Sequence, residues 1–158
     1  MNKMEIEIFN KKMLTCKEAR YLALSSCFFL VPIYCGYSCN EYFYTIPLFL
    51  SWFFSVNYWI HPRYSWRRYA DIIFSSIAAV LFTTKCFFVV KNPYYIIVGY
   101  PNMAIFYYLF YLSNVKFEQG CPHWWKYHIV FHFLCSLNQF MLLDDVCLTL
   151  SKDNNREH

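Results

Sequence analysis

Residues 42–60 read YFYTIPLFLSWFFSVNYWI, a stretch without a charged side chain. Four more apolar, aromatic-rich stretches occupy residues 21–37, 72–90, 94–113 and 124–143. The hydrocarbon core of a bilayer is about 30 Å thick, and a helix needs about 20 residues to cross it. Because lipid offers the backbone no hydrogen bonds, such stretches must be helices. The sequence therefore predicts an all-α fold, a polytopic transmembrane helical bundle with about five spans.

The spans divide the chain into three parts. We expect a cytosolic N-terminal segment of mixed charge over residues 1–20, a transmembrane domain over residues 21–143 and a polar tail over residues 144–158. The chain has 158 residues, of which 58% are hydrophobic and 23% aromatic. Little is left for loops, so no segment is long enough for a separate soluble domain.

Basic residues predict the orientation of the bundle. With the N-terminus in the cytosol and the C-terminus on the opposite side, ten of the 14 Lys and Arg residues fall on the cytosolic side. These ten are Lys3, Lys11, Lys12, Lys17, Arg20, Arg63, Arg67, Arg68, Lys116 and Lys126. The asymmetry fits the positive-inside rule. It also explains the net charge of +4 without nucleic acid as a partner.

Packing inside the bundle is expected to rely on aromatic side chains. Only three glycines occur, so close helix crossings through small residues are not expected. Asn102 follows Pro101 at mid-membrane depth, and we expect its amide to form a hydrogen bond with another helix. Lys85 lies near the outer end of its span and is expected to extend outwards to the interface.

The eight cysteines include three that fall near the outer face, Cys35, Cys39 and Cys147. If that face is oxidising, a disulfide can form among them, and free thiols are the alternative. The sequence contains no C-x-x-C pair, which argues against a thioredoxin-type or zinc-ribbon motif.

Four ionisable residues lie at membrane depth, where charge is costly and indicates function. They are His61, Asp71, His128 and His132, and the predicted topology brings all four to the cytosolic leaflet. On one helix His128 and His132 are about 40° apart and about 6 Å apart along the axis. Cys135 and Gln139 fall on the same stripe.

This spacing predicts a candidate zinc site. An H-x-x-x-H pair on one helical face can bind a single metal ion. His61 can supply a third ligand and water a fourth, which is the open pattern of catalytic zinc. Asp71 can then orient or deprotonate that water.

Each of these residues also has a structural interpretation. Histidines near an interface can bond water, headgroups or backbone carbonyls, and His61 before Pro62 can simply end a helix. Arg67 and Arg68 lie four and three residues before Asp71, a spacing that neutralises a carboxylate on a helix.

The order of these residues resembles the CREST superfamily of membrane hydrolases, which includes the alkaline ceramidases. His61, Asp71 and the segment His128-Ile129-Val130-Phe131-His132 stand in the family's order. The resemblance implies that the three histidines bind zinc and that Asp71 assists water attacking an amide or ester. The family's Ser four residues before the first His is Asn57 here, although Ser55 is close by. Asn57 can still donate a hydrogen bond to an oxyanion. The family typically has seven spans rather than five.

Three functions remain open from the sequence. The first is a zinc-dependent amide or ester hydrolase acting on a membrane lipid at the cytosolic leaflet. The second is a non-enzymatic membrane scaffold or assembly protein without metal. The third is a channel or transporter, for which the sequence offers neither a ring of charges nor repeat symmetry. The sequence does not decide the organelle or the oligomeric state.

Overall fold

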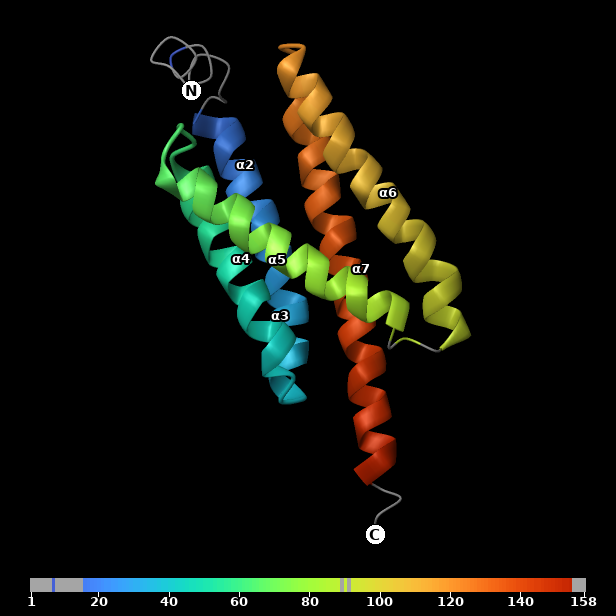
Figure 1. Ribbon diagram of the computed structural model, residues 1–158. Coiled ribbons are helices and arrows are strands. Elements are labelled where there is room, and N and C mark those ends of the chain that lie inside the picture. The colour runs from blue at the N-terminus through green and yellow to red at the C-terminus, as the bar shows by residue number, and fades with distance from the viewer. Residues whose placement is uncertain (1–6, 8–15, 89, 91, 155–158) are drawn as a thin grey trace.

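The computed structural model describes residue 7, residues 16–88, residue 90 and residues 92–154, and these residues form a helical bundle (Figure 1). The first segment consists of α2 (Cys16–Ser26), the 3-10 turn η1 (Cys27–Phe29) and α3 (Leu30–Ser38). The others are α4 (Tyr42–Ile60), α5 (Trp66–Phe88), α6 (Pro93–Glu118) and α7 (Trp124–Asn154). The predicted all-α fold is confirmed. Most of the predicted N-terminal segment and the last residues of the predicted tail lie outside the described residues.

Four helical segments are long and apolar enough to cross a membrane. They cover Lys17–Ser38, Trp66–Phe88, Pro93–Glu118 and Trp124–Thr149. The chain therefore has the architecture of a multi-pass membrane protein. The 19 residues of α4 match the predicted span residue for residue, but α4 is not one of these four segments. Its membrane crossing stays a prediction.

The helix ends are distributed as the predicted up-and-down topology requires. Figure 1 shows that α2, α5 and α7 begin at the end of the bundle where α4 and α6 finish. The C-terminal end of α7 lies at the opposite end. Helices α6 and α7 lie side by side, and α4 packs along α5. Which end faces the cytosol stays a prediction.

A proline in the first segment creates a link between the two ends of the chain. Pro32 has no N–H, so it cannot donate the helical hydrogen bond to the Phe28 carbonyl. The helix tightens into η1 just before this point. The Ser136 hydroxyl on α7 donates to the Phe28 carbonyl at 2.6 Å. A side chain of the last helix thus supplies the donor that Pro32 lacks.

The core consists of two apolar clusters at different depths. One is centred on Phe29, Leu48, Phe82 and Leu143, and it joins the first segment to α4, α5 and α7. The other combines Leu22, Tyr58, Trp59 and Trp124 near the opposite end. Both clusters contain aromatic rings, as the composition predicts.

The expected hydrogen bond of Asn102 is confirmed. Its amide donates to the Leu134 carbonyl of α7 at 3.0 Å. One helical turn further along α7, Asn138 donates to the Gly99 carbonyl of α6 at 3.0 Å. Two amides therefore join α6 to α7 on either side of Pro101.

Gly36 makes a close contact between helices through a small residue, which was not expected. A Cβ atom at Gly36 would overlap Thr45 Oγ1 and lie 3.3 Å from Leu143 Cδ1. The Thr45 and Leu143 side chains therefore occupy the space that a side chain at residue 36 would need.

We expect Gly36→Ala to destabilise the protein by about 1–3 kcal/mol, because the added methyl group overpacks this contact. Gly99→Ala is the matched control, since its nearest neighbour is Asn138 Oδ1 at 3.8 Å, an ordinary contact distance. Thermal unfolding in detergent measures both effects. A similar loss in the two variants would contradict a tight α3–α4 contact.

Lys85 differs from its expected outward orientation. Its side chain is only 4% exposed, and Nζ lies 3.4 Å from Glu41 Oε2. The ammonium group also lies 3.6 Å from the centroid of the Tyr44 ring. An acidic partner at the start of α4 therefore keeps the charge inside the bundle instead of at the interface.

Candidate functional site

A cavity of about 560 Å³ lies between α4 and α5 on one side and α6 and α7 on the other. This volume falls within the usual range for small-molecule sites, about 300–1,000 Å³. Much of its wall is apolar and includes Ile72, Ala78, Val80, Phe106, Phe110 and Phe131. Its polar lining includes Ser55, Asp71, Ser75, His128, His132 and Gln139.

The two histidines of α7 are positioned by serines of other helices. His132 Nδ1 lies 2.8 Å from Ser25 Oγ on α2, and His128 Nδ1 lies 3.2 Å from Ser113 Oγ on α6. The two imidazole rings are 4.7 Å apart between centroids. Both hydrogen bonds use Nδ1, so Nε2 is the nitrogen that each ring keeps for a ligand.

The bonds of Ser25 decide the tautomer of His132. The Ser25 hydroxyl donates its proton to the Leu22 carbonyl at 2.8 Å. The same oxygen must therefore accept from Nδ1–H of His132, because a hydroxyl has only one proton. In the neutral ring this bond leaves the lone pair on Nε2, and that form can bind a metal or accept a proton.

Asp71 lies in a network of hydroxyl groups. Ser75 donates to Asp71 Oδ1 at 3.3 Å, and Ser75 Oγ lies 3.0 Å from Ser51 Oγ on α4. Ser55 and Arg68 also interact with the carboxylate. The predicted partial neutralisation by an arginine one turn earlier is therefore present, yet Asp71 still lines the cavity.

The structure separates the predicted site residues into two groups. Asp71, His128 and His132 line one cavity. His61 is exposed at the C-terminal end of α4, and neither His61 nor Asn57 belongs to the cavity lining. Among the described residues, the three histidines do not bring their ligand atoms within 4.8 Å of one another. The zinc site with three histidines stays a prediction.

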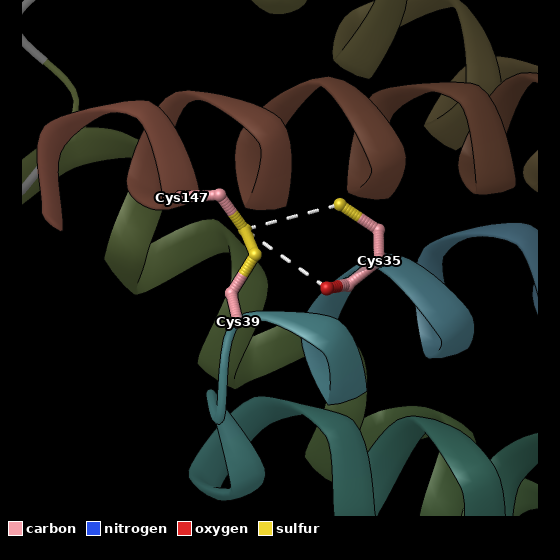
Figure 2. A group of neighbouring side chains, drawn as sticks. All are labelled: Cys35, Cys39 and Cys147. Atoms are coloured by element: carbon pink, nitrogen blue, oxygen red, sulfur yellow. Dashed lines mark hydrogen bonds between the residues drawn. A yellow bond between two sulfur atoms is a disulfide. The ribbon is translucent and has the colours of Figure 1, made fainter. Parts of the chain in front are cut away.

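The group of described residues that does meet this distance is Cys35, Cys39 and Cys147 (Figure 2). Cys39 and Cys147 form a disulfide with a Cα–Cα distance of 5.6 Å, and the Sγ atoms of Cys35 and Cys147 are 4.0 Å apart. The sequence had left the choice between a disulfide and free thiols open. Since two of the sulfurs are bonded to each other, the trio offers a metal only one thiolate.

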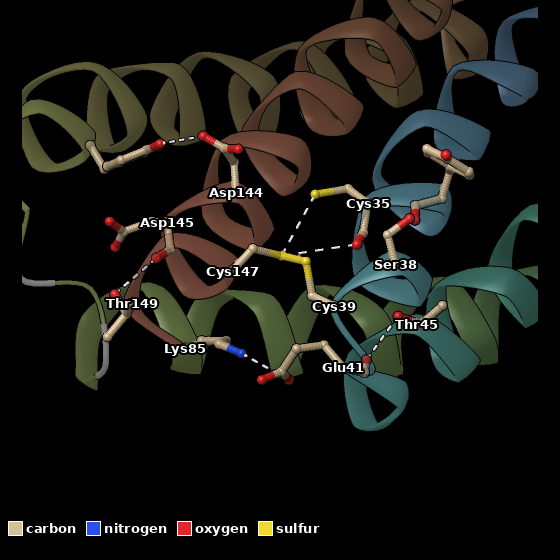
Figure 3. The surroundings of a disulfide bond; sticks show 12 residues. Cys35, Ser38, Cys39, Glu41, Thr45, Lys85, Asp144, Asp145, Cys147 and Thr149 are labelled. Carbon is tan, nitrogen blue, oxygen red and sulfur yellow. Dashed lines mark hydrogen bonds and ion pairs between the residues drawn. A yellow bond between two sulfur atoms is a disulfide. The ribbon is translucent and has the colours of Figure 1, made fainter. Parts of the chain in front are cut away.

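Charged and polar residues surround the disulfide (Figure 3). The Lys85–Glu41 ion pair lies on one side of it, and Asp144 and Asp145 of α7 lie on the other. The Tyr95 hydroxyl donates to Asp144 Oδ2 at 2.8 Å. This polar region lies at the end of the bundle opposite to the histidines.

Ser25 and Ser113 were missed by the sequence analysis. A serine within an apolar span carries no sign of the residue that it will contact, because its partner depends on which helices adjoin. The stripe formed by His128, His132, Cys135 and Gln139 was predicted, and all four residues are at least half-buried in the wall of the cavity.

No protein-family model, curated protein or solved structure matches this chain. The resemblance to the CREST superfamily therefore depends on its few matching residues alone.

Proposed function

We propose that this membrane protein binds a lipid in the cavity between α4–α5 and α6–α7. The observation that carries the proposal is the joint presence of Asp71, His128 and His132 in one largely apolar cavity at membrane depth. Ionisable groups in that position are costly and usually serve a function. The apolar wall suits an acyl chain, and the polar end suits a headgroup.

The chemistry of the polar end favours an uncharged headgroup with hydroxyl groups. Asp71 would repel an anionic head, whereas Asp71 and the imidazole Nε2 atoms can accept hydrogen bonds from hydroxyls. A monoacylglycerol has such a headgroup and a single chain.

A test of lipid binding can use a side chain that fills the cavity. Ala79 lines the cavity, while Ala104 is exposed on α6. We expect 1-stearoylglycerol to raise the unfolding temperature of the wild type and of Ala104→Phe but not of Ala79→Phe. Native mass spectrometry of the lipid complex provides a second measurement. Equal binding by both variants would show that the lipid lies elsewhere, and no binding by the wild type would refute the proposal.

Hydrolysis of an ester or amide is a second candidate function, favoured by the hydrogen bonds of the histidines. Metal-binding histidines usually donate their other ring N–H to an oxygen, which orients the ring. Ser25 accepts from Nδ1–H of His132 in this way, and Ser113 Oγ lies beside Nδ1 of His128, so both Nε2 atoms are left for a zinc ion. Zinc would polarise the carbonyl and activate water, and Asp71 can take the proton of that water. The third predicted ligand, His61, is not part of the lining of this cavity.

Metal content distinguishes this hydrolase from a metal-free lipid-binding or scaffold protein. We expect about one zinc ion per chain in detergent-purified wild type, and loss of the metal in His128→Ala/His132→Ala. His123→Ala is the matched control, since His123 is exposed at the start of α7. If the folded wild type contains no stoichiometric metal, the hydrolase candidate fails and lipid binding without metal chemistry remains.

A further inference from the structure

The cavity of the proposed lipid site is open on one side. The residues of its lining that come from α4 and α7 are buried or half-buried, and His132, for example, is only 3% exposed. By contrast, Val80 on α5 is 65% exposed and Phe110 on α6 is 43% exposed, although both line the same cavity. The exposed residues of the lining all lie on these two helices: Ile72, Ser76, Val80 and Thr84 on α5, and Tyr107 and Phe110 on α6. Helices α4 and α7 therefore form the closed wall of the cavity, and its open side lies between α5 and α6.

The exposed lining residues of α5 form one edge of this opening. They recur every four residues from Ile72 to Thr84, so successive side chains are about 40° apart around the helix and about 6 Å apart along it. The edge is thus about 18 Å long. The opening therefore extends along α5 instead of being confined to one end of the bundle.

Helices α5 and α6 are close to each other where α5 ends and α6 begins. There the Tyr100 hydroxyl donates to the Cys86 carbonyl at 3.1 Å, and the hydroxyls of Thr83 and Tyr107 lie 2.7 Å apart. Towards the N-terminal end of α5 the two helices diverge, as Figure 1 shows. The opening therefore widens from the Thr83–Tyr107 bond towards the end of the bundle where the histidines lie.

In a membrane this opening leads to lipid. Both α5 and α6 are long and apolar enough to span a bilayer, so the flank between them faces acyl chains at the depth of the cavity. A lipid that moves sideways into the cavity keeps its chain in apolar surroundings throughout. Entry from the aqueous phase would instead expose the chain to water, which is unfavourable.

We propose that a lipid enters the cavity sideways from the bilayer, through the opening between α5 and α6. The inference rests on the proposed lipid binding and adds the route of entry and the position of the chain. The headgroup lies at Asp71, His128 and His132, and the end of the chain lies in the opening, in contact with the surrounding bilayer. A lipid whose chain ends in a bulky group therefore still binds.

The test compares 1-stearoylglycerol with 1-(10-pyrenyldecanoyl)glycerol, whose chain ends in a rigid aromatic ring system. A closed cavity would exclude this ring system, whereas an open one lets it remain in the bilayer. We expect the pyrene lipid to bind the wild type with an affinity within about 3-fold of that of stearoylglycerol. Native mass spectrometry with the two lipids in competition measures the ratio and shows whether they share one site. Ala79→Phe, which fills the cavity, should bind neither lipid.

The position of the pyrene group provides a second measurement. The protein is placed in nanodiscs that contain phosphatidylcholine with a nitroxide on its acyl chain. Because a nitroxide quenches fluorescence only at short range, a pyrene group in the opening should be quenched, and one enclosed by the bundle should be shielded. We expect the bound lipid to be quenched nearly as strongly as free pyrene lipid in nanodiscs without protein.

Val80→Trp tests the opening itself, because it places a large side chain at the edge of the cavity. It should weaken binding of the pyrene lipid by about 10-fold or more and still bind stearoylglycerol, which shows that the variant is folded. Ile77→Trp is the matched control, since Ile77 is also exposed on α5 but does not line the cavity. This control should bind both lipids like the wild type.

The outcomes separate the two proposals. If stearoylglycerol binds but the pyrene lipid does not, or the bound pyrene group is shielded from the nitroxide, the lateral opening is refuted and lipid binding stands. Equal binding of the pyrene lipid by Val80→Trp and Ile77→Trp would also contradict a route past Val80. If neither lipid binds the wild type, both proposals fail.

Discussion

Glu41→Ala will lower the free energy of unfolding by about 3–5 kcal/mol, the usual cost of leaving a buried charge without its partner. The partner is Lys85, whose side chain is 4% exposed and whose Nζ lies 3.4 Å from Glu41 Oε2. The Tyr44 ring offers some compensation as a cation–π partner but cannot replace a carboxylate. Denaturant titration in detergent micelles, followed by tryptophan fluorescence, measures the loss.

The double variant Glu41→Gln/Lys85→Met distinguishes the charge from the packing. It removes both charges and approximately preserves both volumes, so we expect it to recover most of the stability lost in the single variant. An equally unstable double variant would mean that the shape of Glu41, rather than its charge, stabilises the start of α4.

Cys147→Ser is expected to destabilise the protein by about 2–5 kcal/mol. The disulfide joins the end of α3 to α7 across 108 residues, so the loop that it closes covers most of the chain. Closing a loop of this length removes much conformational freedom from the unfolded chain. Thermal unfolding with and without reductant measures the contribution, which should vanish in the variant.

Cys39→Ser should cost less than Cys147→Ser, because Cys35 Sγ lies 4.0 Å from Cys147 Sγ. Under oxidation Cys35 can then bond to Cys147 and close a loop of nearly the same length. In Cys147→Ser, the remaining pair, Cys35 and Cys39, could close only a short loop, which stabilises little. Peptide mapping should detect a Cys35–Cys147 bond in Cys39→Ser. Its absence, together with equal losses in the two variants, would contradict this interpretation.

The helix ends show what the sequence could and could not predict. Residues 42–60 are bounded by Glu41 and by His61-Pro62, so the bounds of α4 were predicted residue for residue. The continuation of α7 beyond Leu143 was not predicted, because Asp144 and Asp145 resemble the start of a polar tail. Their carboxylates bond to Tyr95 and Asn92, and α7 runs on to Asn154. Such partners on another helix cannot be read from local sequence.

The sequence predicted at which end of the bundle the candidate site residues lie, but not whether their side chains point into the cavity. Counting residues along each span brought His61, Asp71, His128 and His132 to one end of the bundle, and the helix ends in Figure 1 agree. Whether a side chain enters the cavity depends on the rotation of its helix, and a residue at a helix end can leave the bundle altogether. His61 does so at the end of α4. Lys85 is the opposite case: it was expected to extend outwards, but its ion pair with Glu41 keeps its side chain buried.

The length of α7 exceeds the thickness of a bilayer. Its 31 residues extend about 46 Å, against a hydrocarbon core of about 30 Å. If Trp124 marks one interface, the opposite one falls about 20 residues later, near Asp144 and Asp145. The remaining turns of α7, about 15 Å long, would then extend through the lipid headgroups as a helix. On the side opposite to the histidines, α7 would thus form a helical projection into the aqueous phase.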